Sequence, residues 1–311
     1  MRSRGRGSLV ALAAVLSLLV AGCGGSEDRR PEGRTVTVEA ANGAVTVPVA
    51  PQRIISLAPT HTETLFAIGA GERVVAVDDQ STYPAQAPRT RLSGVTPNAE
   101  AVIGYEPDLV IVSGDSGGLV AALRKVGIPV LVEPAAKDLA DAYDQIADLG
   151  TATGRAEQAR ALVDRMRADI DGAVRAAPRT VRPLTYFHEL DPQLFTVTST
   201  TFVGRVYGAF GLQNVADAAD AGGSGYPQLS REALLQSDPA LILLADAQCC
   251  GQSPETVAQR PGWRDLRAVR DGTVVALPAD VASRWGPRLP EFYRAVGAAV
   301  TLVAERAPAG G

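Results

Sequence analysis

The side chains most capable of metal chemistry are scarce in this sequence. The 311 residues contain two histidines, His61 and His188, and three cysteines. A protein metal site needs three or four converging ligands, often with a Cys-x2-Cys spacing, and that spacing does not occur. The sequence therefore predicts no direct metal site and no cofactor. Each histidine is expected to be a hydrogen-bonded residue of a cleft or of the surface.

Cys249 and Cys250 are adjacent in the sequence. In an oxidising compartment they could form a vicinal disulfide. Adjacent Cα atoms are about 3.8 Å apart across a trans peptide, below the usual disulfide range, so such a ring is strained. Two free thiols are the alternative. The disulfide is the favoured interpretation of the two.

A serine nucleophile is a further chemical hypothesis. Ser116 lies in Gly114-Asp115-Ser116-Gly117-Gly118, the nucleophile string of trypsin-like proteases. His61 and the acids Asp78 and Asp79 precede it in the order His, Asp, Ser. Here the string joins a predicted strand to a predicted helix, whereas those enzymes are antiparallel barrels. The α/β-hydrolase elbow is not indicated either, because the candidate string Gly222-Gly223-Ser224-Gly225 has no predicted strand before it. Hydrolysis by Ser116 is therefore the remote alternative to a protein that performs no catalysis.

Two glutamates occupy equivalent places in an internal repeat. Residues 100–112 and 232–244 both begin with Glu-Ala and continue to an acid-Pro pair and an apolar run. The offset is 132 residues throughout, from 100 to 232 and from 107 to 239. A period this long predicts two similar lobes rather than a solenoid. Glu100 and Glu232 would then be equivalent residues of the two lobes.

The elements that position these residues alternate between strands and helices. This order predicts an α/β fold with a parallel sheet in each lobe. Asn42-Gly43, between two β-branched runs, predicts a hairpin. Thr60 and Glu63 have capping-box spacing at a helix start. Residues 138–174 have helical periodicity almost throughout and predict one long helix that crosses from lobe to lobe.

The N-terminus has the composition of a targeting segment. Basic residues precede an apolar run from Leu9 to Val20, which is too short for a comfortable membrane span. Val20-Ala21-Gly22-Cys23 resembles a bacterial lipobox, which implies lipidation of Cys23. An ordinary secretory signal is the alternative. The net charge of −4 and the lack of a basic tract argue against a nucleic-acid partner.

Four stretches resemble the cobalamin and ferric-siderophore periplasmic binding proteins. They are residues 53–63 (RIISLAPTHTE), 106–111 (EPDLVI), 226–232 (YPQLSRE) and 284–288 (RWGPR). They follow the order of that family and span about Val36 to the C-terminus, which is more specific than any single motif. The resemblance implies two Rossmann-like lobes bridged by one long helix. The implied function is a solute-binding lipoprotein of an ABC importer.

The domain organisation implied by the resemblance has five parts. These are a lipoprotein signal peptide (1–22), the lipidated cysteine and tether (23–35), a first α/β lobe (36–137), a connecting helix (138–177) and a second α/β lobe (178–311). The chain would be a monomer held on the outer face of the cell membrane by its lipid. Its partners would be the membrane and an ABC permease dimer with its ATPase subunits.

In this family one glutamate on each lobe docks onto permease arginines, and these glutamates fall on Glu100 and Glu232. Charge-assisted Arg–carboxylate pairs would fix the register of the two proteins. The alternatives are a solvated helix N-terminal acid and a role in the repeated fold.

Loops at the carboxyl ends of the strands should line the ligand cleft. The ligand-binding residues expected there are Thr60, His61, Tyr83, Ser113, Asp115, Phe195, Tyr226, Asp280, Arg284, Trp285 and Arg288. The resemblance places Tyr226 at an aromatic position, and Asp280 and Arg284 at positions that contact corrin amides. Three of the eleven residues have a plainer interpretation: Tyr226 packed on the lobe surface, Phe195 in the core, and Arg288 in an ion pair at a helix start.

The sequence departs from the cobalamin binders at two places. They carry tryptophans where this chain has residues 94–97 (GVTP), and Trp285 would supply a ring from the other lobe. The Cys249-Cys250 turn has no counterpart in the family pattern. The predicted ligand is therefore a metal chelate, either cobalamin or a ferric siderophore. Haem and a free metal ion are the alternatives, and two histidines make the free ion the weaker of them.

Overall fold

The computed structural model describes residues 34–179 and 182–306. The predicted signal peptide, the lipidation site Cys23 and the tether as far as residue 33 lie outside the described residues. The tether is predicted to extend to residue 35, but Thr35 is already the first residue of strand β1. The predicted boundary is therefore one residue too late. None of the helices in the described part has the length and apolar character that crossing a bilayer requires.

The described chain begins with the predicted hairpin. Strands β1 (Thr35–Ala40) and β2 (Gly43–Pro48) pair antiparallel around the Asn42-Gly43 turn. Gly43 has φ of 91°, a conformation that glycine adopts at little cost. The Asn42 amide donates to Val130 O at 2.9 Å and its oxygen accepts from Val132 N at 3.2 Å. The hairpin is thus anchored to the first sheet.

The first sheet has four parallel strands in the order β4-β3-β5-β6. Its strands are β3 (Ile54–Ser56), β4 (Val74–Val77), β5 (Leu109–Val112) and β6 (Val130–Val132). The helices between them are α1 (Pro59–Ala67), α2 (Ala99–Ile103) and α3 (Leu119–Lys125). All four residues of β5 are buried, as expected for a central strand of a parallel sheet covered on both faces.

The second sheet repeats this topology as β8-β7-β9-β10, again all parallel. Its strands are β7 (Thr185–Glu189), β8 (Gln213–Asn214), β9 (Leu241–Leu244) and β10 (Val274–Ala276). The accompanying helices are α6 (Phe202–Gly208), α7 (Arg231–Ser237), α8 (Ala247–Cys250), α9 (Pro254–Ala258), α10 (Arg267–Arg270) and α11 (Ala279–Ala282). In each sheet the strand order is second, first, third, fourth. The predicted α/β fold with two similar parallel-sheet lobes is confirmed.

The repeat extends to single residues. Asn98 and Ser230 cap α2 and α7, and each side chain accepts from the backbone N–H three residues later. The acids of the two acid-Pro pairs, Glu106 and Asp238, both have positive φ, of 50° and 41°. A non-glycine residue rarely adopts this conformation. Its recurrence at the same offset shows that one helix–turn–strand unit has been used twice.

The segment predicted as one connecting helix is two helices, α4 (Leu139–Ala152) and α5 (Ala156–Ala176). Gly154, with φ of 66°, separates them. Gly150 lets the helices approach closely, because a Cβ at that position would lie 2.4 Å from the Ala159 Cβ. The continuous helix predicted over 138–177 is therefore corrected to a packed pair. Its second member, of 21 residues, is the long helix.

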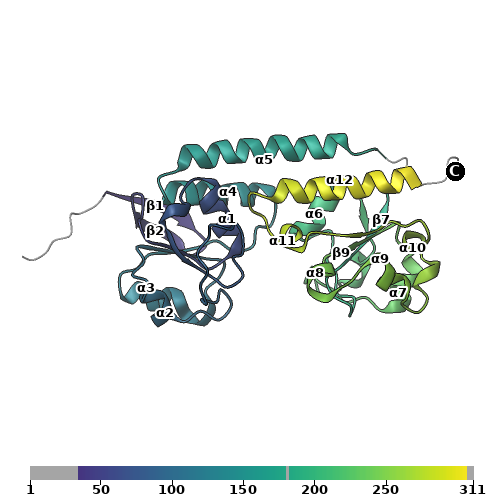
Figure 1. The fold of residues 1–311 in the computed structure, drawn as a ribbon, viewed down its shortest axis with the longest axis horizontal. Helices are drawn as coiled ribbons and strands as arrows, with labels where there is room; N and C mark the ends of the chain where they lie inside the picture. Colours follow the sequence, from purple (N-terminus) through teal and green to yellow (C-terminus); the bar gives the residue numbers. More distant parts are fainter. Residues whose placement is uncertain (1–33, 180–181, 307–311) are drawn as a thin grey trace, which may run out of the picture. The chain divides into compact units, whose positions relative to one another are not determined.

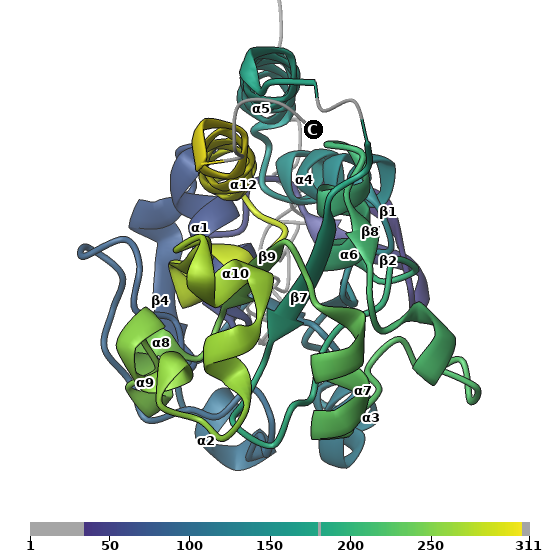
Figure 2. The same cartoon turned by 90° about the vertical axis from the view of Figure 1, so that its right-hand side faces the viewer.

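Helix α5 also packs against the C-terminal helix α12 (Leu289–Arg306). Figure 1 shows these two helices running alongside each other, and Figure 2 views them nearly end-on, with α4 beside them. One apolar cluster continues from the first sheet through these three helices to the second sheet. Two smaller clusters cover the other faces of the sheets. Residues of both lobes therefore share one hydrophobic core.

Candidate functional site

Exposed apolar side chains gather in the loops after the strands. Tyr83 and Val95, both in the loop after β4, are 46% and 77% exposed. Phe195 follows β7 and Tyr226 follows β8, and they are 40% and 53% exposed. Exposed rings are costly unless a partner covers them, and ligands of open parallel sheets bind outside the carboxyl ends of the strands. The core interpretation of Phe195 is wrong, since its ring faces solvent.

The segments that carry Phe195 and Tyr226 lie side by side. Thr196 N donates to Pro227 O at 3.0 Å, and Phe195 forms an isolated bridge with Gln228. A pocket of about 320 Å³ opens beside Tyr226, with Arg205 and Lys137 also in its wall. The second lobe thus presents aromatic surface, with one cationic group from each lobe in the wall of the pocket beside it.

Glu63 of α1 joins the two halves of the chain through two arginines. Arg284 Nη1 lies 2.6 Å from Glu63 Oε1. Arg288 donates to both carboxylate oxygens, through Nε at 2.8 Å and Nη2 at 2.6 Å. The Glu63 side chain is 1% exposed and the arginine side chains 12% and 17%. A buried, bidentate arrangement of this kind fixes the relative positions of the paired side chains far better than an ion pair at the surface does.

Trp285, between the two arginines, is also engaged. Its Nε1 donates to the Gln145 side-chain oxygen at 2.8 Å, and its ring meets the His61 ring edge-on at 6.3 Å. Gly286 abuts the Thr60 backbone, where a Cβ would lie 3.2 Å from the Thr60 carbonyl oxygen. The Trp285–Gly286 turn is therefore packed against α1 and α4.

Two further predicted ligand residues belong to this cluster. The Arg288 guanidinium lies 4.2 Å from the centroid of the Tyr83 ring, a cation–π contact. Asp280 is 3.4 Å from Arg284. A pocket of about 530 Å³ beside Tyr83 and Arg288 is also lined by Glu63 and Phe66.

The structure thus brings together seven of the eleven predicted ligand residues, namely Thr60, His61, Tyr83, Asp280, Arg284, Trp285 and Arg288. Both arginines already bind Glu63. The expected capping box is wrong: α1 starts at Pro59 with no side-chain cap, and Glu63 holds arginines instead. No local sequence pattern pairs these two arginines with Glu63, which lies more than 200 residues away in the chain.

His61 is a buried hydrogen-bonded residue. Its Nε2 lies 2.8 Å from Glu133 O, and because a carbonyl oxygen only accepts, Nε2 carries the proton. Burial lowers its pKa to about 4, so it is neutral at pH 7. His188 is similar: burial lowers its pKa to about 4, and its Nδ1 lies 2.6 Å from the Tyr207 hydroxyl.

The residues of the hydrolase hypothesis are engaged elsewhere. His61 faces Glu133 O, and Asp78 accepts from Ser81. Ser116 opens a short 3₁₀ turn (Ser116–Gly118), and among the described residues no hydrogen bond links it to His61 or Asp78. Of the first-lobe residues predicted to touch ligand, Ser113 is exposed, and exposed Asp115 accepts from Val120 N at 3.0 Å.

A buried carboxyl group, that of Glu133, follows strand β6 of the first sheet. Glu133 is 4% exposed, and its Oε1 has no hydrogen-bond partner among the described residues. Burial raises its pKa to about 8, with further contributions from Asp148 and Asp141. Its side chain is therefore largely protonated at pH 7.

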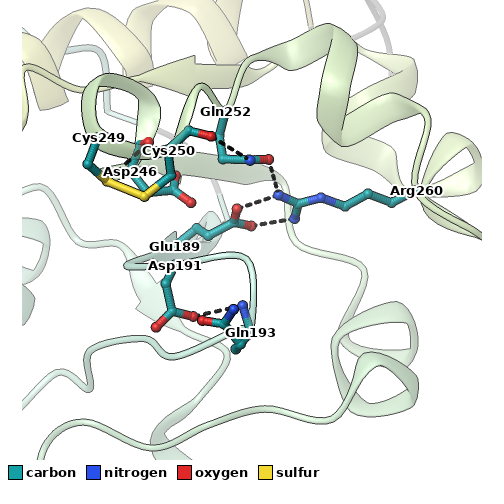
Figure 3. Close-up of a disulfide and its surroundings, with 8 residues drawn as sticks. All are labelled: Glu189, Asp191, Gln193, Asp246, Cys249, Cys250, Gln252 and Arg260. Atoms are coloured by element: carbon teal, nitrogen blue, oxygen red, sulfur yellow. Dashed lines mark hydrogen bonds and ion pairs between the residues drawn. A yellow bond between two sulfur atoms is a disulfide. The ribbon is translucent and has the colours of Figure 1, made fainter.

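The second lobe has a corresponding group at the ends of β7 and β9. Arg260 binds Glu189 with two bonds, of 2.6 and 2.5 Å, and its Nη2 donates to Gln252 Oε1 at 2.6 Å (Figure 3). Asp246 is fully buried beside them, and neither of its carboxylate oxygens has a partner within the described parts of the chain. Burial, followed by the charge of Glu189, raises the Asp246 pKa to about 7.

Cys249 and Cys250 are joined in a disulfide at the end of α8, and both are exposed. The Cys249 Sγ lies 3.5 Å from Asp246 O. A disulfide sulfur has no proton to donate, so this is a contact rather than a hydrogen bond. The adjacent cysteines are visible in the sequence, whereas a buried acid such as Asp246 has no periodic signal there.

Glu100 and Glu232 lie in the first turns of α2 and α7, and both are exposed. Glu232 is 3.7 Å from its neighbour Arg231, and both of these side chains are more than half exposed. Such a pair contributes little to stability. The equivalence of the two glutamates, expected from the repeat, is confirmed.

Comparison with known proteins places these features in one family. A family model described as periplasmic binding protein matches residues 54–281. An uncharacterised ABC transporter substrate-binding lipoprotein of Bacillus subtilis is 29% identical, over 92% of this chain and 94% of its own. A cobalamin-binding protein of Halobacterium salinarum is 31% identical, over 81% and 70%.

Solved structures agree with this. A periplasmic haem-binding protein from Roseiflexus matches with a TM-score of 0.72 and 26% identity, over 81% of this chain and 99% of its own. The repeated four-stranded sheets, the helices that share one core and the matched segment lead to the same assignment. The chain belongs to the periplasmic binding protein family.

Proposed function

We propose that this protein is the extracytoplasmic solute-binding lipoprotein of an ABC importer and that it captures a metal chelate. The observation that carries the proposal is the set of exposed aromatic rings, Tyr83, Phe195 and Tyr226, each after a parallel strand. A large ligand with flat apolar faces would cover these rings.

Cobalamin is the first candidate ligand, because a 31% identical relative is a cobalamin-binding protein. Haem is the second, since a 26% identical structural neighbour binds it. The anionic class of ferric siderophores is supported by the cationic side chains of Lys137 and Arg205 in the pocket beside Tyr226. None of the three ligands undergoes a reaction in this proposal.

Delivery to the permease would use Glu100 and Glu232. Three observations support this role for the two glutamates: they occupy equivalent positions, both are exposed, and neither has a buried ion-pair partner among the described residues. Two carboxylates, one on each lobe, would give a two-point contact with permease arginines. Anchoring through Cys23 is supported by the lipobox-like sequence and by the lipoprotein relative.

The ligand site is tested by replacing one exposed ring. Tyr226→Ala should weaken binding of the preferred chelate about tenfold, since aromatic contacts of this kind are worth on the order of 1 kcal/mol beyond the buried area. Binding is followed by quenching of tryptophan fluorescence, to which Trp285 beside α1 should contribute.

Val126→Ala is the matched control. Val126 is 56% exposed but precedes β6, at the opposite end of the sheet, so its loss should leave affinity unchanged. Equal affinity of the Tyr226→Ala protein and the wild type would remove Tyr226 from the site. An equal loss from both substitutions would show that the effect is not local.

A further inference from the structure

The Cys249–Cys250 disulfide does not tie separate parts of the chain together. The two residues are adjacent, and their Cα atoms are 3.8 Å apart, the spacing that any trans peptide imposes. In the chain-entropy account, a disulfide stabilises a protein by closing a loop in the unfolded state, and here there is no loop to close. Its effect is confined to the shape and chemistry of the surface at this turn.

That surface lies where a ligand would meet the second lobe. Strand β9 ends at Leu244, and α8 with its two exposed cysteines follows after two residues. Glu189, the last residue of the neighbouring strand β7, lies beside the turn (Figure 3). The disulfide therefore occupies the same edge of the sheet as the loops that carry Phe195 and Tyr226.

The turn is held from below by a network of polar contacts. Cys250 N donates to Asp246 O at 3.0 Å, and Gln252 Nε2 donates to Cys250 O at 3.1 Å. Gln252 accepts from Arg260, which also binds Glu189 and lies 4.5 Å from the centroid of the Trp263 ring. The base of the turn is thus fixed by a buried ion pair and a buried ring before any ligand arrives.

The chemistry of the exposed group is unusual for a polar turn. A disulfide offers two polarizable sulfur atoms and no proton to donate, and sulfur makes favourable contacts with aromatic systems. Beneath it, the Asp246 carboxyl lies between the turn and Glu189 with no hydrogen-bond partner among the described residues (Figure 3). Two exposed cysteines joined in a disulfide thus lie next to the buried Asp246 and Glu189 carboxyl groups (Figure 3).

We propose that the Cys249–Cys250 disulfide is a ligand-contacting platform of the second lobe, on which the conjugated face of the bound metal chelate rests. This inference depends on the proposed function and assigns one wall of the same site. It also gives the vicinal pair a role that cross-linking cannot supply.

The experiment compares the wild type with Cys249→Ser/Cys250→Ser and Cys249→Ala/Cys250→Ala. Cyanocobalamin, haemin and a ferric catecholate siderophore are titrated by calorimetry, and thermal unfolding is followed by circular dichroism. Both double variants should bind the preferred chelate about 3- to 10-fold more weakly, as expected for the loss of one sulfur–π contact surface. Both should unfold within about 2 °C of the wild type, because no loop is released.

Ser253→Ala is the local control, since Ser253 caps α9 two residues beyond Gly251 and should not touch ligand. Unchanged affinity in both double variants, with a wild type that binds, overturns the platform and leaves the proposed function standing. A large fall in unfolding temperature with unchanged affinity assigns the disulfide a structural role and also overturns it. A wild type that binds none of the three chelates defeats the proposed function, and the platform with it.

Discussion

At the scale of single residues, the ends of the strands hold carboxyl groups whose charge the fold disfavours. Glu133 follows β6 and Asp246 follows β9, one in each lobe, and both contain buried oxygen atoms without hydrogen-bond partners among the described residues. Burying an ionised carboxylate is costly, so each group binds its proton more tightly than in water. These two positions therefore make the stability of the protein depend on pH.

Glu133→Gln should stabilise the protein at alkaline pH. The folded-state pKa of Glu133 is about 8, raised from 4.5 chiefly by burial and then by Asp148 and Asp141. Between these two values the folded chain holds a proton that the unfolded chain has released, so stability falls as the pH rises from about 4.5 to 8. Glutamine has the same shape and cannot ionise, so its advantage should be greatest above pH 8.

Thermal unfolding at pH 5, 7 and 9 measures this. The melting temperature of the variant minus that of the wild type should become larger from pH 5 to 7 and from pH 7 to 9. Each kcal/mol of destabilisation that the substitution removes should raise the melting temperature by on the order of 2–4 °C. Asp115 is an unsuitable control because its exposed side chain accepts a backbone hydrogen bond. Glu157→Gln, at an exposed position of α5, is suitable. A constant difference across the three pH values would contradict the account.

At the scale of secondary-structure elements, the contact of α1 with the α11–α12 junction contains one buried carboxylate, that of Glu63, which pairs with two arginines. Glu63→Gln would leave Arg284 and Arg288 facing each other, each less than one fifth exposed, with their common anion removed. Breaking a buried ion pair in this way costs about 3–5 kcal/mol. The melting temperature should fall by on the order of 10 °C.

Asp169→Asn tests the same chemistry at the surface. Asp169 of α5 lies 3.9 Å from Arg294 of α12, and both side chains are more than half exposed. Its loss should cost about 0–1 kcal/mol. Similar melting temperatures for the two variants would show that the buried Glu63 ion pairs contribute no more to stability than the exposed Asp169–Arg294 pair.

Local patterns predicted the elements better than their contacts. The hairpin followed from Asn42-Gly43, and the duplicated topology followed from the 132-residue offset, because both depend on short-range or repeated sequence. The break at Gly154 does not follow from the helical pattern, since a glycine within such a pattern lowers helix propensity only modestly. The Glu63–Arg284 pair cannot be predicted in this way, because it joins residues 221 positions apart and no local pattern encodes it.

At the scale of the whole molecule, the two halves share one apolar cluster that passes through α4, α5 and α12. Each half also presents an exposed glutamate at the same place in its repeat. A shared core favours a fixed spacing of the two glutamates, which a two-point dock on a symmetric permease requires.

Charge reversal tests that dock. Glu100→Lys/Glu232→Lys should abolish uptake by cells that carry the permease while leaving the Kd for the chelate unchanged, because neither side chain lines the pocket beside Tyr83 or the pocket beside Tyr226. Glu157→Lys is the control, since it reverses a first-turn acid of another helix and should leave uptake intact. Normal uptake by the double variant would exclude these glutamates as the contacts.

The central claim is that this chain captures a metal chelate, and equilibrium binding tests it most directly. The purified protein is titrated by calorimetry with cyanocobalamin, haemin and ferric siderophores of the catecholate and hydroxamate classes. The account predicts that at least one of them binds with a Kd of about 1 μM or tighter, one per chain, and that Tyr226→Ala weakens that binding. No measurable binding of any of them by a correctly folded protein would contradict it.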